Sequence, residues 1–290
     1  MQVKTYNVFN PNARVELNPG ESVQQALAGT NRILAYVKDI MPEIMTRYVA
    51  ALKQRLVDAT QDSGVDAASF GLDEMSNDLE YLKDVGELQD QVLQFVCQQL
   101  DLPEGFQLGP DKVGVASLNY FKSFRRPSFH SAKACADVLG DEQGVRLWKD
   151  IVARFLQDEK IKYERARQKG MAQDQDEPTL AESRERSIKA WTESGMGDFT
   201  LAIFDDDKIL YRFDSCLTHE ALKDLDDPDW AYLCSCYVSD APGFNFGNRY
   251  LRRAQTLHHG DFCDELYWNP RVYHEPEQPS LEFTQQLGRE

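Results

Sequence analysis

The sequence predicts an α+β protein in which a largely helical N-terminal region is followed by a small antiparallel sheet with helices. Apolar residues recur at helical spacing as far as about Trp191. After Gly195 and Gly197 the pattern changes to short runs rich in β-branched and aromatic residues, which are typical of strands. A chain of 290 residues can bury a substantial core. We expect a helical N-terminal region over residues 1–115 and an α+β domain over residues 116–290.

The N-terminal third is expected to begin irregularly and then turn helical. Residues 1–20 contain two proline-containing turn signals and predict an irregular arm or a short strand. Apolar spacing predicts a helix over residues 21–60, and Pro42 should kink or split it because proline removes a backbone donor and clashes with the preceding turn. A further helix is expected over residues 75–96.

The middle of the chain contains the best candidate for an internal boundary. Residues 103–130 are rich in glycine and proline, and they carry a basic cluster of Lys122, Arg125 and Arg126 that we expect in an exposed loop. Such a cluster can also receive a carboxylate or a phosphate. Helical spacing resumes over residues 134–155 and continues into a charged, solvated helix.

The last hundred residues predict a small sheet with short helices. Thr179 and Glu182 form a capping-box pattern that opens a helix. The elements expected after it are a hairpin of residues 199–204 and 209–213 with an acidic turn, a short helix over 218–225, a helix that Asp229 caps and that carries Cys234 and Cys236, and two strands over 249–257 and 262–268. The tail after Pro270 is expected to wrap the surface.

Composition excludes several classes of partner. The chain has 32 basic and 48 acidic residues, a net charge of −16, which repels nucleic-acid phosphates and anionic lipid headgroups. It has neither a long apolar run nor a signal-like N-terminal segment, so we expect a cytoplasmic protein without a membrane partner. Six cysteines are too few for a disulfide scaffold and are expected to be core residues, nucleophiles or metal ligands.

Reactive side chains gather between Cys216 and Trp268. This stretch holds four of the six cysteines and three of the five histidines. Cys234 and Cys236 lie about 200° apart on a helix, so at most one can face a site. We favour Cys236, because Asp240 lies one turn further on the same face.

Each cysteine can also be a small core residue, which is the interpretation that we adopt for Cys97 and Cys135. A zinc site is a weaker alternative. Cys216 with His219, and His258 or His259 with Cys263, supply suitable ligands, but no CxxC pair is present.

Arg252 and Arg253 are expected in a strand, where one faces inward and the other outward. An inward arginine can hold a substrate carboxylate bidentately, whereas the alternative is an ion pair on the surface. Both interpretations stay open. Thr256 and His258 are further candidates for substrate contacts.

An ordered set of short motifs resembles the L-2-amino-thiazoline-4-carboxylic acid hydrolase family. The set consists of Cys216 after a strand, Cys236 followed by Asp240, Arg253 with Thr256-Leu257, Gly260, and Cys263-Asp264. The resemblance covers about residues 130–270 and is densest over 210–268. The family pattern continues into an aromatic residue and an arginine, where this chain has Glu265 and Leu266.

The resemblance implies a cofactor-independent hydrolase that acts at the amidine-like carbon of a small heterocyclic amino acid or a related metabolite. We expect Cys263 or Cys216 as the nucleophile, Asp240 and Asp264 as proton carriers, and Arg253 on the substrate carboxylate. No cofactor and no metal are expected. The alternative is an accessory protein that binds a small metabolite without turnover. The apolar stripes of the N-terminal helices can also assemble a homo-oligomer.

Overall fold

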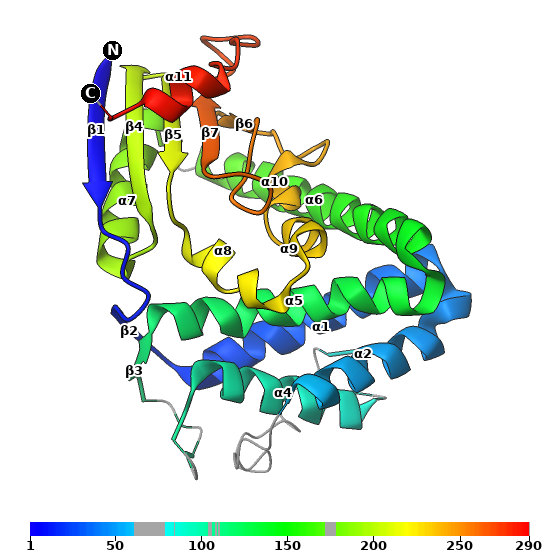
Figure 1. Cartoon of the computed structure of the whole chain (residues 1–290). Coiled ribbons are helices and arrows are strands. Elements are labelled where there is room, and N and C mark those ends of the chain that lie inside the picture. Colours follow the sequence, from blue (N-terminus) through cyan, green and yellow to red (C-terminus); the bar gives the residue numbers. More distant parts are fainter. Residues whose placement is uncertain are drawn as a thin grey trace. The chain divides into compact units, whose positions relative to one another are not determined.

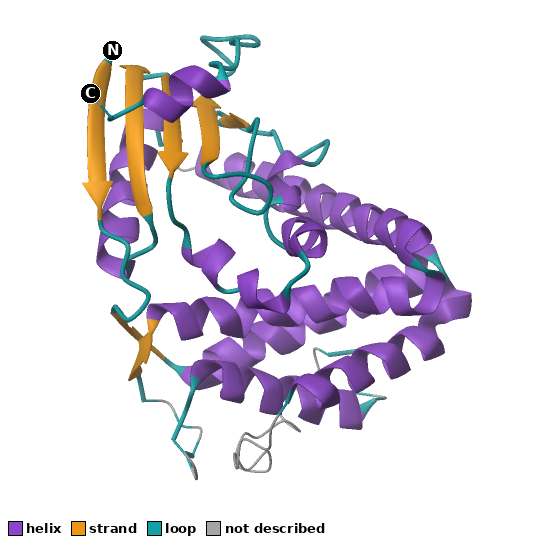
Figure 2. Ribbon diagram, viewed as in Figure 1, coloured by secondary structure: helices purple, strands orange, loops and turns teal. Residues whose placement is uncertain are grey.

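The computed structural model describes residues 1–60, 79–83, 85–103, 106–107, 109, 111–171 and 178–289. It confirms the α+β class (Figures 1 and 2). The chain forms two compact units. The first contains residues 1–11, 152–220 and 236–290, and the second contains residues 12–151 and 221–235. The chain passes between the units after residues 11, 151, 220 and 235, whereas we had expected one boundary after residue 115. We call them the sheet unit and the helical unit.

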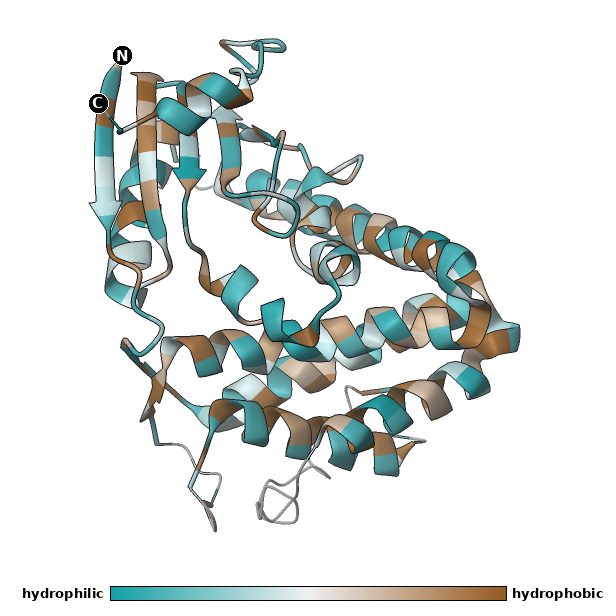
Figure 3. Ribbon diagram, in the orientation of Figure 1, coloured by the Kyte–Doolittle hydropathy of each residue, from teal (hydrophilic) through white to brown (hydrophobic). Residues whose placement is uncertain are grey.

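The helical unit is built on four long helices that share one apolar core. They are α1 (Pro19–Ile40), α2 (Met45–Ala59), α4 (Gly86–Leu100) and α5 (Ser117–Leu139). Helices α4 and α5 contact each other, and each also contacts α1 and α2. Apolar and polar residues alternate along these helices in Figure 3, and the apolar ones that face inward are buried, among them Leu34, Leu52 and Val92.

Smaller elements complete the helical unit. They are β2 (Arg14–Leu17), η1 (Pro42–Ile44), β3 (Val113–Ala116), the start of α6 (Asp141–Met171), η4 (Lys223–Leu225) and α9 (Pro228–Cys234). The split expected at Pro42 is confirmed, because a short 3₁₀ turn separates α1 from α2 there. Strands β2 and β3 form an antiparallel pair.

The expectation of an exposed loop around the basic cluster is wrong. Lys122, Arg125 and Arg126 lie in α5, which continues through Pro127. Packing of α5 against the neighbouring helices α1, α2, α4 and α9 outweighs the local cost of proline in a helix. Arg126 forms an ion pair with Asp224, in which Nη2 donates to both carboxylate oxygens at 2.6 Å.

The helix expected over residues 75–96 begins later, since α4 starts at Gly86. Its expected start near Met75 lies outside the described residues. The charged helix after Gly140 is confirmed as α6. The capping box is confirmed at the start of α7, where Thr179 Oγ1 accepts from the Glu182 backbone and Glu182 accepts from the Thr179 backbone.

The sheet unit contains a five-stranded antiparallel sheet in the order β1-β4-β5-β7-β6. The strands are β1 (Gln2–Asn7), β4 (Asp198–Asp205), β5 (Lys208–Phe213), β6 (Tyr250–Arg252) and β7 (Cys263–Trp268). The helices of this unit are the second part of α6, α7 (Leu180–Ser194), α8 (Leu217–Glu220), α10 (Tyr237–Asp240) and α11 (Leu281–Gln286).

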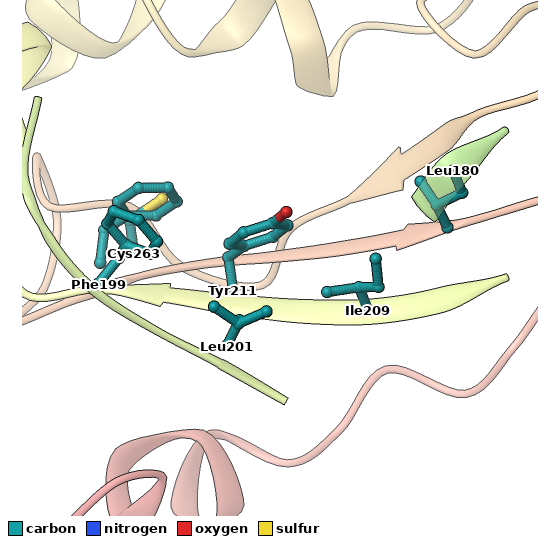
Figure 4. Packing of buried hydrophobic residues seen from close by; sticks show 7 residues of the cluster. Leu180, Phe199, Leu201, Ile209, Tyr211 and Cys263 are labelled. Atoms are coloured by element: carbon teal, nitrogen blue, oxygen red, sulfur yellow. The ribbon is translucent and has the colours of Figure 1, made fainter. Parts of the chain in front are cut away.

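The two sheet faces bury different clusters because side chains alternate along each strand. Phe199, Tyr211 and Cys263 belong to the cluster that packs against α7, and Figure 4 shows side chains of this cluster. Leu266 and Trp268 belong to the opposite cluster, which the C-terminal segment covers with Phe283 and Leu287. The predicted hairpin is confirmed, and the strand expected over residues 249–257 is shorter, since β6 ends at Arg252.

Candidate functional site

Arg253 lies at the centre of the candidate site in the sheet unit. It follows β6, and its side chain is 5% exposed. Nη2 donates to Glu265 Oε1 at 2.6 Å, and Nη1 donates to Asp240 Oδ1 at 2.9 Å and Ser239 Oγ at 3.0 Å. Nη1 also lies 3.3 Å from the Cys236 carbonyl oxygen. Both terminal nitrogens of the guanidinium are therefore engaged within the protein.

Neighbouring groups stabilise the positive charge of Arg253. Burial alone lowers the pKa of the guanidinium, but Glu265, Cys263, Cys236 and Asp240 outweigh it and raise the pKa above the ordinary value. The arginine is a fixed positive charge between two carboxylates. This pairing is the ion-pair alternative considered for Arg253, except that the pair is largely buried and not on the surface.

Glu265 links the arginine to strand β7. Strand alternation places Cys263, Glu265 and Tyr267 on one face. Glu265 Oε2 accepts from the Tyr267 hydroxyl at 3.0 Å while Oε1 accepts from Arg253. Burial raises the pKa of Tyr267 and the Glu265 carboxylate adds to the rise, so the phenol stays protonated and donates.

Three thiols lie within electrostatic range of this pair. Burial raises the pKa of Cys263 well above its usual value, Glu265 adds to the rise, and Arg253 opposes it. The Cys263 thiol is also influenced by Cys236 and Cys216, so segments far apart in sequence bring the three sulfur atoms into one neighbourhood. At neutral pH the Cys263 group is a thiol and not a thiolate.

Cys216 is the thiol of the three whose sulfur receives hydrogen bonds from its own segment. It follows β5 and stands directly before α8, and burial raises its pKa. Hydrogen bonds from the backbone N–H groups of His219 and Thr218 and from the Thr218 hydroxyl lower the pKa and offset part of this rise. These donors would stabilise a thiolate when one forms.

The loop that carries Cys216 is held by close backbone packing. The Leu217 backbone N–H donates to the Met196 carbonyl at 2.8 Å. A Cβ atom at Gly197 would lie 2.1 Å from the Ser215 carbonyl oxygen, so only glycine allows this approach. The two glycines at which the sequence pattern changes therefore include one that positions a candidate nucleophile.

Asp264 lies on the opposite face of β7 from Cys263. It is fully buried, and its Oδ1 accepts from the backbone N–H groups of Ala254 at 2.8 Å and Gln255 at 2.7 Å. Its Oδ2 accepts from Gln278 Nε2 at 2.6 Å. These bonds tie the turn after β6 and the C-terminal segment to the sheet, which is a structural task.

The remaining candidates lie in the turn between β6 and β7. Thr256 is buried, and among the residues that the structure describes no partner lies within hydrogen-bond distance of its hydroxyl. His258 is buried against His219, with the two ring centroids 5.1 Å apart. Through His219 this turn lies beside the segment that carries Cys216.

The helical interpretation of Cys234 and Cys236 needs correction. Asp227, not Asp229, caps α9, and the helix ends at Cys234. Cys236 belongs to the following turn, because Ser235 leaves the helical conformation. The angular argument therefore does not apply, although Cys236 and Asp240 do both reach Arg253. Cys234 Sγ instead lies 3.4 Å from the Ala231 carbonyl in its own helix.

Cys97 and Cys135 lie in the core of the helical unit, as expected. Both are buried, and burial raises the pKa of each thiol to about 12. Among the described residues no group of three or more His, Cys, Asp or Glu side chains is arranged as a metal site. In the same described part of the chain, no helix is long and apolar enough to cross a membrane.

A pocket of about 570 Å³ adjoins the arginine. Its wall is formed by residues that follow or belong to α10, β6 and β7, together with the start of the C-terminal segment: Ser239, Asp240, Ala241, Asn245, Tyr250, Leu251, Arg252, Arg253, Trp268, Pro270, His274 and Glu275. Neither Cys216, Cys236 nor Cys263 is one of these lining residues. Asp240 and Arg253 thus face the pocket and also belong to the cluster that contains the thiols.

Sequence reasoning overlooked Glu265 as a site residue. It had identified this position only as a difference from the family pattern. The signal was present in the strand itself: once Cys263 faces a site, a period of two places Glu265 on the same face and Asp264 on the other. Thr218 and Tyr267 were also missed, because a hydroxyl near a helix start or in a strand has no distinctive spacing.

Comparison of the chain with protein-family models, with curated proteins and with solved structures gave no significant match.

Proposed function

We propose that this chain is a cofactor-independent hydrolase that opens a C–N or C–S bond at the amidine-like carbon of a small heterocyclic amino acid or related metabolite. One observation carries the proposal. Arg253, two carboxylates and three thiols, contributed by four separate segments of the sheet unit, form one cluster around a largely buried ion pair. Buried charges and nucleophiles cost stability, so their concentration is typical of functional sites.

Cys216 is the nucleophile in this proposal. Its sulfur already accepts hydrogen bonds from two backbone N–H groups and one hydroxyl, which stabilise the thiolate as it forms. Because its pKa is raised, a base must take the proton when substrate is bound. Glu265 is the carboxylate whose charge acts on both Cys216 and Cys263, and we assign it this role in place of Asp264. Arg253 and Tyr267 hold the Glu265 side chain in place.

The reaction proceeds in two stages for an aminothiazoline ring. The Cys216 sulfur bonds to the amidine-like carbon, and the thiol proton passes through Glu265 to the ring nitrogen. The ring C–S bond then breaks, and the departing sulfur takes a proton from the amino group, which leaves an isothiourea on the enzyme. Water adds to the same carbon, the enzyme C–S bond breaks, and the Cys216 sulfur regains a proton. The product is an N-carbamoylated cysteine, one water heavier than the substrate.

The test is incubation with L-2-amino-thiazoline-4-carboxylate, followed by mass spectrometry of both small molecule and protein. We expect a product that has gained one water, and loss of turnover in Cys216→Ala. Glu265→Gln should lower kcat by a factor of about 10² to 10⁴, the usual contribution of one general base. Cys234→Ala is the matched control, because that thiol bonds within α9, and it should retain full turnover.

Two results decide against the thiol mechanism. If Cys216→Ala, Cys236→Ala and Cys263→Ala each retain the turnover of the unaltered protein, none of the three sulfurs attacks. If the unaltered protein binds the compound without changing its mass, the chain is a metabolite-binding accessory protein. That second candidate is favoured by one observation, the absence of the three thiol residues from the lining of the pocket beside Arg253. A cytoplasmic location and self-association through the N-terminal helices belong to the proposal in either case.

A further inference from the structure

The two edges of the five-stranded sheet differ. Strand β6 has three residues, and the side-chain amide of Asn245 covers its outer backbone. Asn245 Nδ2 donates to the Leu251 carbonyl oxygen at 2.9 Å, and Oδ1 accepts from the Leu251 N–H at 2.7 Å. Strand β1 has six residues, pairs with β4 and is the outermost strand of the sheet in Figure 1. No strand that the structure describes lies on its other side, so a row of backbone N–H and C=O groups is available for pairing.

Apart from Lys4, strand β1 lacks the features that usually block strand addition at an edge. Its register with β4 runs from Gln2 to Asn7 without a shift, so no bulge turns the edge away. It contains no proline, and each of its residues is exposed except Tyr6, which is half-buried. The first acidic residue of the sequence is Glu16, so the strand lacks the negative charge that dominates a chain of net charge −16. Repulsion between two acidic copies is therefore not reinforced at this edge.

One face of β1 adds an apolar groove to the unpaired edge. Met1, Val3 and Thr5 point to the same face and line a groove of about 390 Å³ together with the C-terminal segment. Phe283 and Leu287 form the apolar part of its other side. Met1 is 70% exposed and Val3 is 42% exposed. A strand added to β1 would cover both side chains and remove apolar surface from water.

The symmetry of a homodimer limits how two β1 strands can pair. A two-fold axis perpendicular to the sheet pairs them antiparallel and keeps each face on its own side, so residues that lie opposite each other share a face. The residue on the axis lies opposite its own copy. An axis through Lys4 would place two lysines opposite each other, which is destabilising. An axis through Thr5 would place Val3 opposite the partner subunit's Asn7 and leave Met1 outside the paired strands.

An axis through Val3 makes the edge complementary to itself. On the groove face Val3 lies opposite the partner subunit's Val3, and Met1 lies opposite the partner subunit's Thr5. These pairs bury the apolar side chains that are exposed in the single chain. On the other face Gln2 lies opposite the partner subunit's Lys4, where the amide oxygen can accept from the ammonium group. No like charges face each other in this register.

We propose that two copies of this chain associate by antiparallel pairing of β1 with β1, with Val3 on the two-fold axis, so that their two sheets become one continuous sheet. The interface belongs to the sheet unit, differs from the N-terminal helices considered above for self-association, and is independent of the proposed hydrolase activity. Backbone hydrogen bonds and apolar contacts hold it together, while the net charge of −16 on each chain opposes it at long range.

The test is sedimentation equilibrium of the full chain at loading concentrations of about 5 to 500 µM, a range that covers weak dimers. We expect a monomer–dimer equilibrium with a Kd within these limits, because an interface made by one short strand is at the small end of specific interfaces. Raising NaCl from about 20 mM to about 0.5 M should tighten the dimer about threefold or more, since salt screens the repulsion between acidic chains.

Variants of exposed valines locate the interface. Val3→Glu removes the apolar pair and places two carboxylates opposite each other on the axis, so it should weaken the dimer about tenfold or more. Val272→Glu is the matched control, because it makes the same change at a 58% exposed position away from β1, and it should leave the Kd unchanged. Val57→Glu, at a 41% exposed position on α2, disturbs the surface of the N-terminal helices and should leave the β1 dimer in place.

A cross-link tests the register. Residues directly opposite each other in an antiparallel pair have Cα atoms about 4.5–5.5 Å apart, which suits a disulfide. In Val3→Cys two introduced thiols should form an intermolecular disulfide by exchange with glutathione disulfide, which is reduced to two molecules of glutathione. Asn7→Cys has no opposite residue in this register and should not cross-link. Peptide mass spectrometry distinguishes this disulfide from any that involves the six native cysteines.

Four results would overturn the proposal. The first is a chain that stays monomeric up to about 500 µM, which excludes even a weak dimer. The second is a dimer that salt dissociates, because charge pairs would then hold it together. The third is a dimer that Val57→Glu disrupts and Val3→Glu does not. The fourth is equal cross-linking of Val3→Cys and Asn7→Cys, or none in either variant. These results do not depend on hydrolysis of the thiazoline compound, so failure here is distinguishable from failure of the proposed function.

Discussion

The ion pair between Arg253 and Glu265 is predicted to couple the two residues energetically far more strongly than a surface pair does. Arg253 is 5% exposed and Glu265 is 15% exposed, and the closest nitrogen and oxygen atoms lie 2.6 Å apart. Opposite unit charges about 4 Å apart attract by about 4 kcal/mol at an effective dielectric constant of 20. Asp240 shares the guanidinium, and Glu265 is partly solvated. We therefore expect a coupling free energy of about 2–3 kcal/mol.

A double-mutant cycle measures this coupling. Arg253→Met, Glu265→Gln and the double variant are compared with the unaltered chain by urea unfolding, followed by circular dichroism and tryptophan fluorescence. Arg253→Met should cost about 3–5 kcal/mol, because it leaves two carboxylates without their buried cation. Glu265→Gln should cost less, because glutamine still accepts from Arg253.

The control cycle uses Arg146 and Glu142, which form an ion pair on α6 with side chains that are 72% and 80% exposed. Exposed helical pairs contribute about 0.3–0.5 kcal/mol. If the coupling between Arg253 and Glu265 were as small as in this control, the cluster would not be a desolvated charge centre. The argument that selects it as the functional site would then fail.

Three further predictions concern pH, backbone packing and thiol reactivity. Burial lowers the pKa of His130 to about 4, whereas the pKa of histidine in the unfolded chain is about 6.5. Between these two pH values the unfolded chain binds a proton and the folded chain does not. The free energy of unfolding of the helical unit should therefore decrease by about 3 kcal/mol between pH 6.5 and 4. In His130→Phe the unfolding free energy should depend less on pH over this range. An unchanged pH dependence would show that His130 is not its cause. Gly197→Ala should lower the unfolding free energy by more than about 2 kcal/mol because its methyl group meets the Ser215 carbonyl, whereas Gly29→Ala, which meets nothing within 4 Å in α1, should raise it by about 0.5–1 kcal/mol. Finally, Cys263 should react slowly with iodoacetamide at neutral pH because burial and Glu265 raise its pKa. Glu265→Gln should accelerate the labelling of Cys263, as measured by peptide mass spectrometry. Equal labelling rates in the two proteins would show that Glu265 does not act on this thiol.

Local sequence patterns were sufficient to predict most helices and strands of the fold. Helical periodicity predicted α1, α2 and α6, and the Thr179–Glu182 pattern located the start of α7, because these signals depend on neighbours within one or two turns. The hairpin of β4 and β5 was equally clear, since its acidic turn separates two runs of strand formers. Errors arose where long-range packing decides the outcome. Helix α5 runs through Pro127 because α1, α2, α4 and α9 pack against it, and no local pattern contains that information.

The candidate site shows the same division. Residue types and their spacing identified the stretch that is rich in reactive side chains, and they predicted Arg253, Asp240, Cys236 and Cys216 as site residues. The partners of these residues depend on the tertiary structure. Asp240 and Glu265 form ion pairs with Arg253, the arginine that the resemblance places on a substrate carboxylate. Glu265 lies on the same face of β7 as Cys263 because alternate side chains of a strand point to opposite faces. The same alternation places Asp264 on the other face, away from the thiols. Residue types and spacing can be read along a chain, but burial, pairing and pKa depend on segments that meet only when the chain folds.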